Sequence, residues 1–289
     1  MKFGINTLLW GATFSPADFH HLPRIREAGF DGVEIPIFDP ATCPSIDIGR
    51  ELRRVGLECT AVSIMPPGVS LGAAGADVRS RGRRHVMSCI RSAAEMGASL
   101  LAGPLYSPVG YFTGQRRTHD EWKWAVESWQ KLADAVVDAG LEIGLEPLNR
   151  FETYFLNTAS DAAAFCDEVG HPAIGLLVDT FHANIEEKTI GEALGVAAPH
   201  LKHLHTCEND RGIPGSGHVA WTEFFAAVHD AGYDRWLTIE SFGFSLGQLS
   251  AAASIWRDMA PTPDAIAFEG LTFLRRASGR DSAAKTTAS

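Results

Sequence analysis

The chain has 289 residues, of which 45% are hydrophobic and 21% are charged, and its formal net charge at pH 7 is -10. This composition is typical of a globular protein with a sizeable core, and the negative charge argues against nucleic acid or an anionic membrane as a partner. The five cysteines form no C-x-x-C pair, and neither a leader nor a membrane-spanning run is visible, so we expect reduced thiols and a cytoplasmic protein.

Short apolar or β-branched segments alternate with longer amphipathic segments along the whole chain. The predicted strands cover residues 2–8, 31–35, 57–63, 99–103, 141–146, 174–179, 201–206 and 235–241. The predicted helices cover residues 16–28, 45–55, 77–97, 119–139, 158–169, 183–195, 221–231 and 247–276. Eight strands that are each followed by a helix most economically form an α/β fold of the TIM-barrel type, a (β/α)₈ barrel.

The alternation continues without a Pro/Gly/Ser-rich linker, so we expect a single domain over residues 1–278 and a flexible tail over residues 279–289. A doubly wound open sheet is the structural alternative, but it usually has a Gly-rich nucleotide loop after its first strand, and that loop is absent here. Two long connections, residues 103–118 and 207–220, follow the fourth and seventh strands. In barrels such loops build the active site.

Four of the predicted strands end in residues of the kinds that bind metal ions. These residues, late in the fifth to eighth strands, are Glu146, Asp179, His205 and Glu240. Because side chains alternate along a strand, each shares a face with the residue two positions earlier, and we expect that face to line the barrel interior. The carboxyl ends of barrel strands meet at one mouth, so the four side chains should converge there.

Three carboxylates and one imidazole in a partly dry mouth would be costly without a cation between them. Mixed oxygen and nitrogen ligands suit one divalent ion per subunit, with Mn²⁺ favoured and Co²⁺ or Mg²⁺ as alternatives. The competing interpretation is that each residue is an ordinary strand-end group held in a salt bridge. We interpret His203 as a packed barrel residue, and Glu34 either as a rim residue or as the partner of a nearby arginine.

Several segments resemble the ketose 3-epimerases, the D-tagatose and D-allulose 3-epimerase family among the xylose-isomerase-like barrels. The resemblance is specific in the second half of the chain, in GLEPLNRFETYFLNT (144–158), VDTFHANIEE (178–187), HLHTCENDRGIPGSGHVAW (203–221) and TIESF (238–242). In the first half it is limited to the opening strand, VEIP at 33–36 and the loop that begins at residue 103.

The resemblance implies roles for seven residues and a homodimer or homotetramer. It implies that Glu146 and Glu240 are catalytic and bind the metal with Asp179 and His205. It implies that the substrate is held by Glu152, His182 and Arg211. We expect C3 epimerisation of free ketoses of the D-tagatose, D-allulose/D-fructose or L-ribulose type, in which a metal stabilises an enediolate and the two glutamates transfer protons on opposite faces of C3.

Other readings of the same residues stay open. The same metal site could serve a sugar isomerase, an inosose dehydratase or a keto-sugar lyase, and metal-dependent abasic-site endonucleases share the barrel, although they need a more basic surface. A sugar-binding barrel without catalysis is a further alternative. The adjacent Arg116 and Arg117 invite a phosphorylated substrate, but such loop pairs are usually solvated, and the glycines of GIPGSGH indicate turns in a movable loop.

Overall fold

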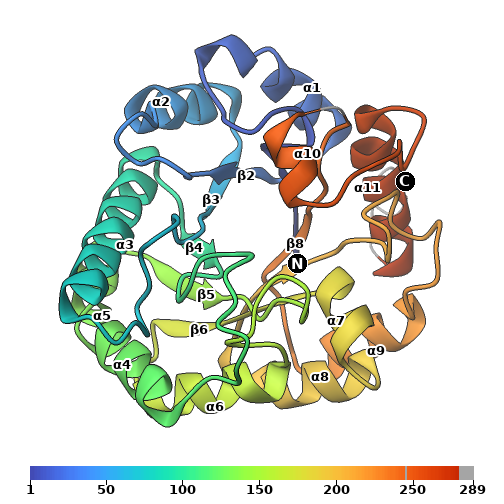
Figure 1. Cartoon of the computed structure of the whole chain (residues 1–289). Helices are drawn as coiled ribbons and strands as arrows, with labels where there is room; N and C mark the ends of the chain where they lie inside the picture. The colour runs from blue at the N-terminus through green and yellow to red at the C-terminus, as the bar shows by residue number, and fades with distance from the viewer. Residues whose placement is uncertain (245, 280–289) are drawn as a thin grey trace.

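The computed structural model describes residues 1–244 and 246–279, and its strands are parallel and close into one barrel in sequence order. Figure 1 looks along the barrel, with the strands inside a ring of helices. The strands are β1 (Lys2–Asn6), β2 (Gly32–Pro36), β3 (Glu58–Val62), β4 (Leu100–Gly103), β5 (Glu142–Leu145), β6 (Ile174–Asp179), β7 (Leu201–His205) and β8 (Trp236–Ile239). The predicted (β/α)₈ barrel is confirmed.

The helices follow the strands as predicted in order, with short 3-10 turns between some of them. The helices are α1 (His21–Ala28), α2 (Ser45–Val55), α3 (Ala76–Met96), α4 (His119–Gln130), α5 (Ala133–Asp138), α6 (Ala159–Val169), α7 (Thr180–Glu186), α8 (Ile190–Ala197), α9 (Trp221–Asp230), α10 (Gln248–Ala252) and α11 (Pro263–Ala277). The 3-10 turns are η1 (Thr7–Leu9), η2 (Pro16–Asp18) and η3 (Ala198–His200).

Four helices predicted as continuous are each two elements, which corrects the prediction. The pairs are η2 with α1, α4 with α5, α7 with α8, and α10 with α11. The last break has a clear cause, because Pro263 occupies the first turn of α11 and the Thr262 side chain accepts a hydrogen bond from the Ala265 amide. Thr189 caps α8 in the same way. A capped start forces the preceding chain out of the helical conformation, so the apolar periodicity alone could not locate these breaks.

The interior of the barrel and the layer between strands and helices form separate apolar clusters. A side-chain carbon placed on Gly144 would meet Leu177, Ala102 and His203, so these four positions share one interior layer. Leu100 belongs to the same small cluster. The predicted alternation along β5, β6 and β7 is therefore confirmed. Around β4 to β6 the layer below the mouth therefore consists of small and apolar groups, which are joined from β7 by the imidazole of His203.

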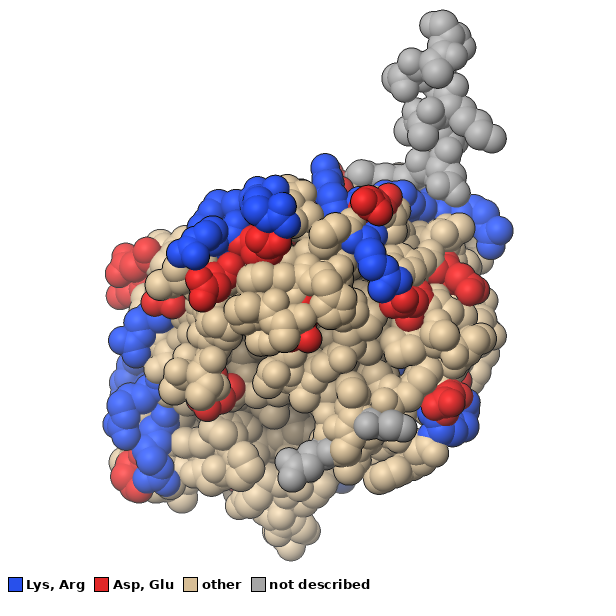
Figure 2. Space-filling model, turned by 90° about the horizontal axis from the view of Figure 1, so that it is seen from above, with Lys and Arg blue, Asp and Glu red and all other residues tan. Residues whose placement is uncertain are grey.

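The outer surface mixes charges of both signs. On the face in Figure 2, acidic and basic side chains lie next to one another rather than in separate fields. Within residues 1–244 and 246–279, every helix is too short or too polar to cross a lipid bilayer. Cys59, Cys89, Cys166 and Cys207 are buried and unpaired, as expected for reduced thiols. The predicted tail lies outside the described residues except for Gly279.

Candidate active site

The four strand-end residues meet at the carboxyl mouth of the barrel. Glu146 directly follows β5, Asp179 ends β6, His205 ends β7 and Glu240 directly follows β8. Each is at most 5% exposed, and one ligand atom from each lies within 4.8 Å of the others, which is close enough to share a metal ion. The structure therefore brings together all four residues predicted as ligands, while their role in metal binding stays a prediction.

Two polar atoms of this group have no hydrogen-bond partner among the described residues. They are Nδ1 of His205 and Oε1 of Glu146. Nδ1 lies 3.4 Å from Glu240, 3.8 Å from Asp179 and 3.8 Å from Glu146, in each case measured to a carboxylate oxygen. A buried polar atom without a partner costs about 1–3 kcal/mol. A metal ion bound between these atoms would satisfy both, so the donor set fits a divalent cation.

Arg211 is buried beside the same carboxylates rather than exposed on its loop. Its guanidinium donates to Asp179 Oδ2 at 2.7 Å and to Glu240 Oε2 at 3.0 Å, and it lies 4.1 Å from the ring centroid of Phe181. Burial alone would raise the pKa of Asp179, but Arg211, His205 and His182 together outweigh it and hold this pKa well below its usual range. The backbone of Arg211 is left-handed, with φ of 66°, a conformation that costs energy in a residue other than glycine.

The carboxyl group of Glu146 is held in the opposite electrostatic state. Burial and the negative charge of Glu240 raise the pKa of Glu146 well above its usual range. The main chain at this position is fixed by Tyr106, whose hydroxyl donates to the Glu146 carbonyl at 2.8 Å. Burial and the neighbouring charge therefore favour the protonated form of Glu146 in the absence of a cation.

His182, at the start of α7, presents a neutral imidazole to the same space. Its Nδ1 accepts from the backbone amide of Asn149 at 3.1 Å, so a neutral ring carries its proton on Nε2. Nε2 lies 3.3 Å from Nη2 of Arg211 and 3.7 Å from Oε1 of Glu146. Burial lowers the pKa of His182 to about 3. Two donors, one from His182 and one from Arg211, therefore point to the same part of the mouth.

A cavity joins these residues to the predicted substrate residue Glu152. Glu152 is half-buried, its carboxylate accepts from Asn149 Nδ2 at 2.8 Å, and burial raises its pKa. The polar residues that line the cavity are Glu146, Glu152, His182, Arg211 and Glu240. Its apolar lining includes Leu8, Phe38, Ile64, Val109, Leu148 and Phe242. A cavity lined by a few polar side chains among apolar ones suits a small polar molecule that the polar groups orient.

Glu208 was not singled out from the sequence, yet it organises the loop that carries Arg211. Its buried carboxylate accepts from the backbone amides of Asn209, Gly215 and Val219 and from Nε1 of Trp221. Gly217 allows this arrangement, because an added side-chain carbon there would lie 2.7 Å from Glu208. The turns of GIPGSGH are therefore tied to one carboxylate, and the predicted movement of the loop stays a prediction.

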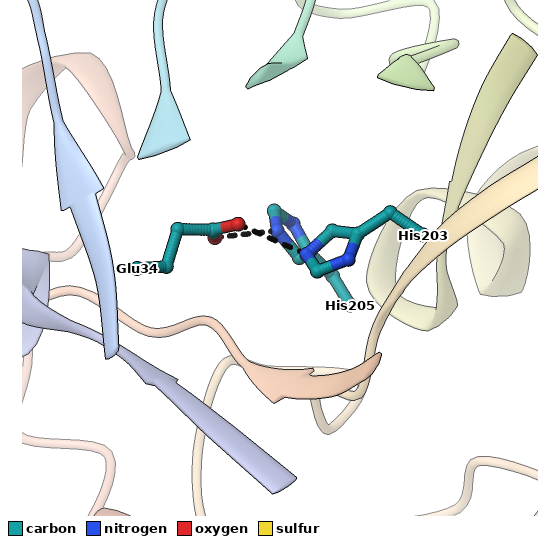
Figure 3. A group of neighbouring side chains, drawn as sticks. All are labelled: Glu34, His203 and His205. Carbon is teal, nitrogen blue, oxygen red and sulfur yellow. Dashed lines mark hydrogen bonds and ion pairs between the residues drawn. The ribbon is translucent and has the colours of Figure 1, made fainter. Parts of the chain in front are cut away.

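Glu34 corrects both interpretations given to it. It is fully buried and pairs with His203 and His205 (Figure 3). Within residues 1–244 and 246–279, its ion-pair partners are these two histidines and not an arginine. Asn6, at the end of β1, was also missed, although its side chain donates to Glu34 at 2.9 Å and to Glu240 at 3.3 Å. For Asn6 the signal was present, because it is a polar group at a strand end, the rule that selected the four predicted ligands, whereas Glu34 lies in the middle of β2.

The basic pair in the loop after β4 does not contribute to the cavity. Arg117 donates to Asp161 at 2.9 Å and lies over the ring of Trp122, while Arg116 is exposed. Among the described residues that line the cavity, Arg211 is the one arginine or lysine, and two carboxylates already engage it. The geometry therefore offers no support for a phosphorylated substrate.

Comparison with known proteins identifies the family of this chain. A family model described as "Xylose isomerase-like TIM barrel" matches residues 22–277. A probable ketose 3-epimerase of Synechocystis sp. is 34% identical over 96% of both chains, and an L-ribulose 3-epimerase of Mesorhizobium japonicum is 34% identical over 93% of both. The crystal structure of a D-allulose 3-epimerase from Methylomonas sp., in complex with D-allulose, superposes with a TM-score of 0.91 at 28% identity and covers 96% of this chain and 97% of the other.

Proposed function

The chain belongs to the xylose isomerase-like TIM-barrel family and, within it, to the ketose 3-epimerases, so it is a carbohydrate epimerase. From this premise we propose that it inverts C3 of free ketoses by metal-assisted proton transfer. The observation that carries the proposal is the convergence of two buried acids, Glu146 and Glu240, on a cavity that also holds His182 and Arg211. The relatives are named for D-psicose, L-ribulose and D-allulose, and substrates of that class are the ones we propose here.

Glu146 and Glu240 act as the acid-base pair. Removing the proton at C3 of a ketose and returning one to the opposite face requires a base on one side and an acid on the other. Glu146 and Glu240 follow β5 and β8 and line the same cavity, so one carboxylate can accept the C3 proton while the other, in its acid form, returns one. Either glutamate serves as the base, depending on the configuration of the incoming ketose.

Glu146, Asp179, His205 and Glu240 would hold one divalent ion, with Mn²⁺ favoured and Co²⁺ or Mg²⁺ as alternatives. Such an ion supplies Lewis-acid stabilisation of the negative charge that develops on the oxygens of an enediolate. Nδ1 of His205 and Oε1 of Glu146 support this assignment, because both atoms are buried, lie near one another and have no hydrogen-bond partner among the described residues. The protein itself contributes a preformed, buried set of donors that needs little rearrangement.

Glu152, His182 and Arg211 orient the C1 and C2 end of the sugar. The Nε2 proton of His182 and the guanidinium of Arg211 are donors for its oxygens, and the Glu152 carboxylate is an acceptor for a hydroxyl. Holding that end in place sets C3 between the two glutamates, which accelerates the reaction by positioning. The apolar walls of the cavity are then left for the distal carbons.

The decisive experiment is to incubate the Mn²⁺-loaded protein with a panel of ketohexoses and ketopentoses in D₂O and to locate the incorporated deuterium by NMR. Epimerisation through an enediolate places deuterium at C3 of both epimers. Label at C1 or C2 would indicate aldose-ketose isomerisation, and loss of water or carbon-carbon cleavage would indicate dehydratase or lyase chemistry. Either result would overturn the proposed activity while keeping the metal site.

A further inference from the structure

Below the mouth lies a second buried cluster that shares one residue with the candidate metal site. Glu34, at 0% exposure in β2, has its Oε1 2.8 Å from Nε2 of His205 and its Oε2 2.9 Å from Nε2 of His203. Oε1 also accepts from Asn6 at 2.9 Å, and Oε2 accepts from Thr60 Oγ1 at 3.0 Å. Figure 3 shows the carboxylate of Glu34 directed at both imidazoles.

The imidazole of His205 faces the two clusters with its two nitrogens. Nε2 points down to Glu34, and Nδ1 points up among Glu146, Asp179 and Glu240. Oε1 of Glu34 already accepts from the side-chain amide of Asn6, and Oε2 accepts from the hydroxyl of Thr60, so both oxygens act as acceptors. Nε2 of His205, at 2.8 Å from Oε1, is then the donor of the hydrogen bond between them. A neutral ring then presents the Nδ1 lone pair to the mouth.

We propose that Glu34 is the positioning residue of the metal site, because it fixes the ring orientation and the Nε2–H tautomer of His205 so that Nδ1 is the ligand. The inference rests on the proposed function in one respect, that His205 binds the metal. Carboxylates that accept from the second nitrogen of a histidine ligand act in this way in many metal sites, and their loss weakens metal binding about 10–100-fold.

The same carboxylate is linked to a second predicted ligand through Asn6. The amide of Asn6 donates to Glu34 Oε1 at 2.9 Å and to Glu240 Oε1 at 3.3 Å, so one side chain spans both clusters. Its carbonyl oxygen accepts from the Leu8 amide, which fixes the orientation of the side-chain amide. Glu34, in β2, therefore supports His205 directly, and it supports Glu240 through Asn6, which ends β1.

Stability alone gives little reason for a charge at this depth. Burying an ion pair commonly stabilises a fold no better than apolar residues of the same volume would. Here, however, each oxygen of Glu34 has two partners, and one of those partners points its other nitrogen at the candidate ion. The arrangement is accounted for if the carboxylate aims His205.

The test compares Mn²⁺ affinity among folded variants, using the EPR signal of free Mn²⁺ as the readout. Glu34→Gln keeps the size of the side chain but supplies an amide where a carboxylate was, and we expect Mn²⁺ to bind about 10–100-fold more weakly. Glu34→Asp should lose less, since the charge remains. The matched control is His203→Gln, which removes the other imidazole of the cluster and should leave Mn²⁺ affinity close to that of the wild type. Thermal unfolding of the metal-free variants establishes that each is folded.

Three outcomes decide the matter. Wild-type Mn²⁺ affinity in folded Glu34→Gln would overturn the positioning role and leave the proposed function intact. Unchanged affinity in His205→Gln would overturn the metal site itself and the positioning role with it. Independently of any variant, the Mg²⁺-loaded wild-type protein labelled with ¹⁵N in its histidine rings should show His205 as the Nε2–H tautomer, and an Nδ1–H tautomer would refute the proposal.

Discussion

The two halves of the barrel treat their polar strand ends differently. In the second half, the ends of β5 and β7 leave Glu146 Oε1 and His205 Nδ1 without hydrogen-bond partners among the described residues. In the first half, the carboxylate of Glu34 accepts hydrogen bonds from Asn6 and Thr60, and it pairs with His205 and, at 2.9 Å, with His203. Both oxygens of Glu34 therefore have partners, whereas two of the proposed metal ligands each keep a polar atom without one in the part of the chain that the structure describes.

This difference has an energetic meaning. Leaving a polar atom buried and unpaired costs about 1–3 kcal/mol, so the chain carries this cost at the ligand-facing side. On the supporting side, each carboxylate oxygen of Glu34 has two partners, which holds the neighbouring side chains in a single orientation. A rigid supporting layer under an unsatisfied layer is what a preorganised metal and substrate site requires.

Removing the proposed metal ion should have the largest effect on activity, because the ion would satisfy the unpaired atoms of Glu146 and His205. We expect a chelator to abolish epimerisation and Mn²⁺ to restore it. Mn²⁺ at one hundred times its Kd should also stabilise the fold by about 2.7 kcal/mol, measured as a shift in thermal unfolding. If a preparation shown by elemental analysis to be free of metal kept full activity, the proposed difference between a metal-binding half and a supporting half would be wrong.

Neutralising either glutamate should follow in size. Glu146→Gln and Glu240→Gln each remove one proton-transfer group, and we expect the exchange of the C3 proton in D₂O to slow by about 10²–10⁴-fold. The control lies at the other end of the same strand, where Glu142 pairs with Lys202 and Arg235 far from the cavity. Glu142→Gln should retain its activity, and comparable losses in all three variants would indicate a general loss of structure.

The sequence was sufficient to predict the ligand-facing half and insufficient for the supporting half. Glu146, Asp179, His205 and Glu240 could be found because charged residues at consecutive strand ends must converge in a barrel. Asn6 ends β1 and Glu34 lies in the middle of β2, and their position relative to the mouth depends on strand register. Only the pairing of Asn6 with Glu34, and of Glu34 with Thr60, places them beneath the mouth.

Two other features depended on contacts that no local pattern encodes. Glu208 receives its hydrogen bonds from residues 209 to 221, and this folding back of the loop is set by tertiary structure. The helix predicted over 247–276 breaks into α10 and α11, although apolar residues recur on both sides of the break. Periodicity reports which face is buried, and it cannot report that a capped turn starts a second helix.

Replacing Arg211 should have a smaller effect, on KM for the ketose, and so distinguishes a role in substrate binding from a role in metal binding. In Arg211→Lys the charge remains, but the side chain loses Nη2, which lies beside His182, and the planar group that stacks on Phe181. Hydrogen bonds to charged groups contribute about 1.5–3 kcal/mol, so we expect KM for the ketose to rise roughly 10–100-fold. Arg116→Lys, in an exposed position, is the control and should leave KM unchanged. An unchanged KM in Arg211→Lys would remove Arg211 from the substrate residues.

The smallest expected effect is on the stability of the metal-free protein, where the direction in which stability changes with pH is the test. The pKa of Glu146 is raised by burial and by Glu240, so its contribution to stability is complete below its unfolded pKa and is lost as pH rises through the folded one. Glu146→Gln has no such loss, so in the presence of a chelator it should become progressively more stable than the wild type as pH increases.

Glu142, four residues earlier in the same strand, should behave in the opposite way. Burial alone would raise the pKa of Glu142, but hydrogen bonds and charges from Arg235 and Lys202 outweigh it and lower this pKa. Its contribution is present above the unfolded pKa and is lost in acid, so Glu142→Gln should be less stable than the wild type at neutral pH, by at most about 1 kcal/mol for a partly exposed pair. Thermal unfolding of both variants across the pH range would then show two trends of opposite sign, which requires that Glu146 lack the stabilising partners that Glu142 has. Parallel trends would mean that Glu146 is already satisfied without a metal ion, and the distinction between a ligand-facing and a supporting half would no longer hold.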